Sequence, residues 1–140
     1  PRYSNTNPAK HWGARTLRDE HRGYGGFVLE YRGRRIYHAG DSAYFDGFQD
    51  IGARMKPEIS LLPIGAYFPD SFRRVHMGPD EALRAFGDLG SQWLVPMHFG
   101  TFKLSFESMD EPARWLRELA AAASVAERVR FLEEGVPMRF

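Results

Sequence analysis

Short apolar runs bounded by glycine and proline alternate along the chain with stretches in which apolar residues recur every three or four positions. The runs at 59–64 and 93–98 have the length and composition of buried strands. Two further strand-like segments, 26–31 and 35–39, are joined by a turn at Gly33, as in a hairpin. The predicted strands are residues 26–31, 35–39, 59–64, 93–98 and 129–132, with 1–7 as the polar tail of a strand and 136–140 as an edge segment.

The periodic stretches predict helices. Phe48, Ile51 and Met55 fall on one helical face. Pro79 and the acidic pair after it suit the first turn of a helix, where the macrodipole favours negative charge, and Gly90 suits the end of that helix. The predicted helices are residues 45–55, 79–89 and 111–123.

This alternation of strands and helices predicts an α/β fold in which helices cover one face of a mixed sheet. The loops that follow neighbouring strands of such a sheet lie near one another. Asp41 follows the strand at 35–39, and Gly40 lets the backbone bend just before it. His98 ends the strand at 93–98, and the loop 65–76 follows the strand at 59–64. We therefore expect these positions to meet at one edge of the sheet.

The composition narrows the class of protein. With 140 residues, 43% of them hydrophobic and 26% charged, the chain is expected to be one cytoplasmic globular domain. A net charge of +1 provides no strong electrostatic attraction to nucleic acid or to anionic membranes. No apolar run approaches the roughly 20 residues that a membrane-spanning helix needs. Cysteine is absent, so a metal here is bound by histidine or carboxylate side chains.

His11, Asp41 and His98 are residues of the types that bind zinc, and an aspartate can bridge two cations. Local alternatives stand beside this interpretation. Asp41 suits a turn or helix cap equally well, His98 suits a buried structural role, and a loop histidine such as His11 is commonly solvated. In the loop 65–76, Tyr67 and the arginine pair at 73 and 74 either line an anion pocket or are solvated. Neither His21 nor His38 is given a role.

Five segments carry a family resemblance. They are 8–12 (PAKHW), 39–45 (AGDSAYF), 62–67 (LPIGAY), 75–82 (VHMGPDEA) and 96–102 (PMHFGTF). In this order they resemble the C-terminal half of metallo-β-lactamase-fold hydrolases. The likeness is strongest to the branch of N-acyl-phosphatidylethanolamine phospholipase D and the RomA-like and UlaG-like proteins. The resemblance implies half of an αββα sandwich.

The resemblance also implies site roles. His11 resembles the third histidine of the first metal site, Asp41 the bridging catalytic aspartate, and His98 the last histidine of the second site. His76 matches a position beside the substrate pocket, where it would bind substrate or donate a proton, and Tyr67 is expected to contact substrate. The implied chemistry is hydrolysis of a phosphodiester, ester or lactone, small or lipid-like, by a metal-bound hydroxide. Two zinc ions are expected per complete site, with manganese or iron as substitutes.

The family motif His-x-His-x-Asp-His does not occur in the chain. We therefore expect residues 1–140 to be the C-terminal half of a longer domain, with poor metal occupancy and no activity alone. The expected partner is the missing N-terminal half or a second copy, because one half leaves an apolar sheet face uncovered. The alternative is a catalytically silent half-domain that acts through association. A third hypothesis is that two copies build a shared site from His11, Asp41 and His98.

Overall fold

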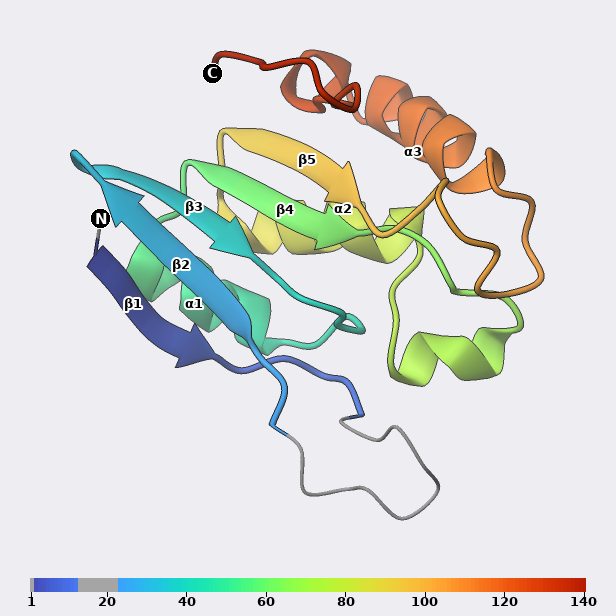
Figure 1. The fold of residues 1–140 in the computed structure, drawn as a ribbon, viewed down its shortest axis with the longest axis horizontal. Coiled ribbons are helices and arrows are strands. Elements are labelled where there is room, and N and C mark those ends of the chain that lie inside the picture. Colours follow the sequence, from blue (N-terminus) through green and yellow to red (C-terminus); the bar gives the residue numbers. More distant parts are fainter. Residues whose placement is uncertain (1, 13–22) are drawn as a thin grey trace.

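The computed structural model describes residues 2–12 and 23–140, and within them five strands form one sheet in the order β1-β2-β3-β4-β5 (Figure 1). The strands are β1 (Arg2–Asn7), β2 (Gly26–Tyr31), β3 (Arg34–His38), β4 (Ile59–Pro63) and β5 (Trp93–Met97). β1, β2 and β3 are antiparallel neighbours, whereas β3, β4 and β5 run parallel. The sheet is mixed, as predicted.

The helices of the described residues are α1 (Gly47–Met55), α2 (Pro79–Leu89) and α3 (Glu111–Ala122), with short 3₁₀ helices η1 (Asp70–Arg74) and η2 (Ala126–Arg128). α1 packs beside α2 on one face of the sheet, and α3 packs against α2 (Figure 1). Pro79 opens α2, and Gly90 ends it in a left-handed conformation, as the sequence indicated. In the part of the chain described here, no helix is long and apolar enough to cross a bilayer.

The two faces of the sheet differ in burial. Successive side chains of a strand point to opposite faces, so one set of positions meets the helices. That set is fully buried and includes Val28, Tyr37, Leu62 and Leu94. The opposite face carries Phe27 and the other large side chains of β2, which are 39–58% exposed. The helices therefore cover one face only, as predicted.

The C-terminal segment lies against this outer face. The Phe140 ring is 6.2 Å from the Trp93 ring, and the Arg34 guanidinium donates a hydrogen bond of 3.2 Å to the Phe140 carbonyl. The expected strand at 129–132 is reduced to a single bridge between Val129 and Leu94, and 136–140 is irregular. The predicted loop 65–76 contains the helix η1, which local periodicity did not reveal.

The parallel strands β3, β4 and β5 all end at the same edge, and their following residues meet there. Ala39 donates to the Leu61 carbonyl at 3.1 Å, and Ile64 donates to the Met97 carbonyl at 3.0 Å. Gly40 has a φ of +65°, which allows the sharp bend before Asp41. The expectation that these strand ends converge is confirmed.

Gly40→Ala is expected to destabilise the chain more than Gly90→Ala. Both glycines are left-handed, so either change costs about 1–2 kcal/mol of backbone strain. A Cβ at Gly40 would also lie 2.8 Å from the Gly25 carbonyl oxygen, whereas a Cβ at Gly90 meets nothing within 4 Å. Overpacking adds about 1–3 kcal/mol at Gly40 alone. Urea unfolding of both variants measures the difference, and equal losses would show that the bend at Gly40 tolerates a side chain.

Candidate metal centre

Asp41 and His98 form a pair of potential ligands at the strand-end edge. Asp41 Oδ1 lies 3.7 Å from His98 Nε2. The Asp41 side chain is 51% exposed and the His98 side chain 19%, so the pair opens to solvent from the carboxylate side. Ligand bonds to zinc are about 2.0–2.2 Å long, so one cation can contact both atoms with little movement.

His98 has a backbone conformation that is rare for a residue with a side chain. Its φ is +61°, in the left-handed region. A Cβ added to Gly65 would collide with the His98 carbonyl oxygen, so the two strand ends touch there and only glycine fits at position 65. Strained conformations of this kind persist where the surroundings determine them, and they cluster at functional sites.

His11 reaches the same edge because its segment is hydrogen-bonded to the turn after Asp41. Ala43 donates to the Lys10 carbonyl at 2.7 Å, and the Lys10 amide donates to Ser42 Oγ at 3.0 Å. His11 Nδ1 donates to the Val75 carbonyl at 2.8 Å. A carbonyl oxygen only accepts hydrogen bonds, so neutral His11 carries its hydrogen on Nδ1 and has a free lone pair on Nε2. Metal-binding histidines are commonly oriented in this way.

His76 lies between the other two histidines. Its ring centroid is 5.1 Å from that of His11 and 5.2 Å from that of His98, with which it stacks. Burial, and then the positive charge that His98 and His11 carry when protonated, lower the pKa of His76 to about 4. His76 is therefore neutral near pH 7. Its Nδ1 and that of His98 are buried without a hydrogen-bond partner among the described residues.

The donor set fits a cation, but it does not make a complete site. Three imidazoles and one carboxylate are ligand types that zinc accepts. Within residues 2–12 and 23–140, however, no group of three His, Asp or Glu side chains is placed to hold one ion. The ring next to His11 is that of His76, which also stacks on His98. The structure thus brings the three predicted ligands to one edge of the sheet. Asp41 and His98 form a pair there, and His11 does not join them in a three-ligand group.

The loop residues expected to contact substrate are engaged elsewhere. Tyr67 is 5% exposed, and its hydroxyl donates to Glu111 Oε1 at 2.7 Å. Burial, and then this hydrogen bond, raise the pKa of Tyr67. Arg73 forms ion pairs with Asp80 and Glu81 at the start of α2. A substrate role for Tyr67 stays a prediction, and in this structure Tyr67 and Arg73 hold the loop 65–76 against α2 and α3.

Two other residues change the sequence-based interpretation. No role was assigned to His38 from the sequence. In the structure its Nδ1 accepts a hydrogen bond of 3.0 Å from the Gly40 amide, which supports the bend before Asp41. Glu107, not singled out, accepts the amides of Ala66 and Phe68. Glu107 follows alternating apolar residues at 102, 104 and 106, a pattern that does not indicate which groups a carboxylate binds, so no local signal marked it. His21 lies outside the described residues.

Stability of the metal-free chain is expected to fall between pH 6.5 and 4 because of His76. Its pKa is lower in the folded state than the ordinary 6.5, so the unfolded chain binds more protons in that interval. The contribution is complete above pH 6.5 and is lost as the pH falls towards about 4. Because the ring is partly exposed, solvent screening limits it to roughly 1–2 kcal/mol. The contribution is measured by urea unfolding of the wild-type chain and of His76→Gln across this pH range, with chelator present. If the free energy of unfolding depends on pH in the same way in both chains, the prediction is contradicted.

Comparison with known proteins identifies the class. A family model described as a beta-lactamase superfamily domain matches residues 5–99, and the chain belongs to that superfamily. An uncharacterized protein of Mycobacterium tuberculosis is 40% identical over 122 residues, which are 82% of this chain and 31% of that protein. A protein of Thermoplasma volcanium named UPF0173 metal-dependent hydrolase is 39% identical over 113 residues, 81% of this chain and 45% of that protein.

Solved structures agree with the fold. The metallo hydrolase Igni18 of Ignicoccus hospitalis superposes with a TM-score of 0.69 at 28% identity, covering 94% of this chain and 49% of that one. An isothiocyanate hydrolase from Delia radicum gut bacteria gives a TM-score of 0.67 at 25% identity, covering 83% and 43%. The predicted α/β architecture of the metallo-β-lactamase type is therefore confirmed. The chain spans less than half the length of each of these proteins.

Proposed function

We propose that residues 1–140 are the C-terminal half of a metal-dependent hydrolase domain. The observation that carries the proposal is the pair of Asp41 Oδ1 and His98 Nε2, 3.7 Å apart at the strand-end edge. The partnerless nitrogens of His76 and His98 support it, because buried polar atoms normally have a partner. Relatives named metal-dependent hydrolases add support.

In this proposal Asp41 and His98 hold one side of a binuclear site, and His11 belongs to the other side. A bound zinc, manganese or iron ion would supply an activated water and stabilise the charge that develops during hydrolysis. The remaining ligands come from the missing N-terminal half. The Val75 carbonyl accepts a hydrogen bond from His11 Nδ1, which orients the ring and leaves Nε2 as the nitrogen that would bind a cation.

His76 is proposed to act on the substrate itself. Its ring lies next to both ligand histidines, and it is uncharged near neutral pH. A neutral imidazole can donate a hydrogen bond to a substrate oxygen or act as a general base. It can protonate the leaving group only after it has accepted a proton, which the attacking water would supply. Asp41 is proposed as the catalytic carboxylate that would bridge the two cations, because each of its oxygens can hold one.

The substrate we propose is a phosphodiester, ester or lactone with an apolar part. A groove of about 230 Å³ beside the site is lined by His98, Phe99, Thr101, Phe102 and Leu104. Phe102 and Leu104 are 74% and 57% exposed, so an apolar group in this groove would cover them. A small or lipid-like phosphodiester, as in the phospholipase D-like branch, meets this requirement.

Chelation is expected to abolish hydrolysis by the longer protein that contains this chain. The reason is that all proposed chemistry needs a cation at Asp41 and His98. The measurement is turnover of a chromogenic phosphodiester, an aryl ester and a lactone after dialysis against chelator, and again after zinc or manganese is restored. Activity that survives complete metal removal, verified by elemental analysis, would contradict the proposal.

A second candidate function is a catalytically silent half-domain that associates with another chain. It is favoured by the lack of a three-ligand group within the described residues and by the exposed outer face of β2. Elemental analysis of residues 1–140 alone separates the candidates, since a full two-metal complement rules out the silent half-domain. Light scattering with and without chelator then tests whether two copies share a metal.

A further inference from the structure

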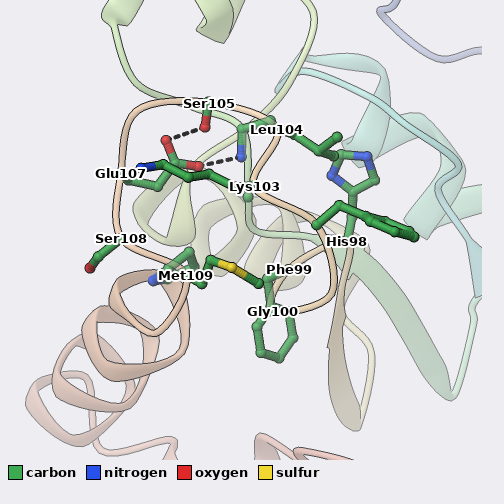
Figure 2. Close-up of a pocket in the computed structure, with 13 residues that line it drawn as sticks. His98, Phe99, Gly100, Lys103, Leu104, Ser105, Glu107, Ser108 and Met109 are labelled. Atoms are coloured by element: carbon green, nitrogen blue, oxygen red, sulfur yellow. Dashed lines mark hydrogen bonds between the residues drawn. The ribbon is translucent and has the colours of Figure 1, made fainter.

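The Glu107 carboxylate joins two loops at the strand-end edge. Its Oε1 accepts the Ala66 amide at 2.6 Å, and its Oε2 accepts the Phe68 amide at 3.2 Å. The Ser105 hydroxyl donates to Oε2 as well (Figure 2). These bonds outweigh the effect of burial, which opposes them, and keep the pKa of Glu107 below its usual value. Glu107 is therefore an anion held by backbone and hydroxyl donors.

The segment that Glu107 holds presses directly on His98. Ala66 has a φ of +65°, a conformation that a residue with a side chain adopts only when its surroundings enforce it. The preceding residue, Gly65, approaches the His98 carbonyl so closely that a Cβ there would collide with it. His98 is itself left-handed, with a φ of +61°. The contact thus joins left-handed His98 to Gly65, the residue before left-handed Ala66, and Glu107 is bonded to the Ala66 amide on one side of it.

Glu107 also closes the loop that begins at His98. Figure 2 shows this loop running from His98 past Lys103 to Glu107 and Met109. The Phe106 amide donates to the Phe68 carbonyl at 3.3 Å, which adds a backbone bond between the same two segments. The space beneath the loop is a cavity of about 20 Å³, room for a single water molecule. His98 is therefore constrained through Gly65 and through its own loop.

We propose that Glu107 is a positioning residue for His98: it holds the 65–68 segment against β5 and so maintains the left-handed turn that directs the His98 ring towards Asp41. The proposal rests on the proposed function only for the identity of that ring as a metal ligand. The effect of Glu107 on the backbone of His98 is independent of any metal.

The test compares wild type, Glu107→Ala, Glu107→Gln and the control Glu118→Ala, which removes an exposed carboxylate from α3. NMR gives the ¹³Cα shift and the HN–Hα coupling of His98, which report its φ, and the amide exchange of Ala66 and Phe68. In Glu107→Ala we expect exchange of both amides to rise at least about tenfold, since hydrogen bonds to a charged group are lost. We also expect the His98 shift and coupling to leave their left-handed values.

Glu107→Gln keeps one acceptor oxygen, so its His98 signals are expected between those of wild type and Glu107→Ala. Glu118→Ala is expected to match wild type. The proposal is overturned if the amides of Ala66 and Phe68 lose protection while His98 keeps its wild-type shift and coupling. If Glu107→Ala does not fold, Glu107→Gln decides: an unchanged His98 beside a deprotected Phe68 or Ala66 would overturn the proposal in the same way.

Adding Mn²⁺ separates this proposal from the proposed function. Paramagnetic broadening of the His98 ring signals reports metal binding. Loss of a residue that supports a metal ligand typically lowers metal affinity 10–100-fold. For Glu107→Ala we expect the Mn²⁺ concentration at half-broadening to rise several-fold. If Mn²⁺ leaves the His98 ring signals of the longer wild-type protein sharp, the metal-ligand role fails. The backbone comparison then still decides whether Glu107 positions His98.

Discussion

Asp41→Ala is expected to lower the hydrolytic rate of the longer protein by roughly 10³-fold, with little change in stability. The Asp41 side chain is 51% exposed, so its removal leaves no cavity in the core. It does remove the carboxylate that faces His98 Nε2 at 3.7 Å and that we propose as a bridging ligand. Losing the groups that stabilise developing charge typically costs 10²–10³-fold or more. Steady-state kinetics at saturating zinc measure the loss.

Asp46→Ala is the matched control, because Asp46 is an exposed carboxylate five residues further on that makes no side-chain capping bond to α1. Its rate is expected to remain near that of wild type. Normal turnover by Asp41→Ala, with zinc content unchanged, would remove Asp41 from the site and with it the proposed binuclear arrangement.

Leu62→Ala is expected to destabilise the chain by about 3–4 kcal/mol. Leu62 is fully buried on the face of β4 that meets the helices, so truncation leaves a cavity. A loss of this size is a large part of the stability of a small domain. Urea denaturation of the purified variant measures it.

Leu61→Ala is the control on the same strand. Leu61 points to the opposite face and is only half-buried, so the expected cost in residues 1–140 is about 1 kcal/mol. In the longer protein the cost is expected to approach that of Leu62→Ala, because the missing half would cover the outer face. A cost that stays near 1 kcal/mol there would contradict the half-domain assignment.

Most of the sheet and its helices were predictable because local patterns govern them. Alternating or continuous apolar runs gave β2 to β5, and the position of Pro79 and Gly90 gave both ends of α2. The edge where Asp41 and His98 meet followed from the parallel order of their strands. The prediction of a strand at 129–132 was wrong, since only Val129 bridges to Leu94 of β5. Pairing there depends on the space beside β5, which a local sequence pattern does not indicate.

The site was predictable only in part. The sequence indicated the types of residue and their place at strand ends, and the family resemblance indicated their roles. It did not indicate that the His76 ring packs against those of both His11 and His98, or that Glu107, in the loop after His98, accepts the Ala66 amide. The first depends on ring contacts between residues 65 and 22 positions apart. The second depends on bonds across 41 and 39 positions to backbone amides, which nearly every residue carries.

The most direct test is anomalous diffraction at the zinc edge from zinc-soaked crystals of this chain or of the longer protein. We expect an anomalous peak within ligand distance of both Asp41 Oδ1 and His98 Nε2, at about 2.0–2.2 Å from each. In crystals of the longer protein, a second peak is expected at His11 Nε2. Strong zinc peaks elsewhere on the surface, with none touching Asp41 and His98 together, would contradict the metal centre proposed at this edge.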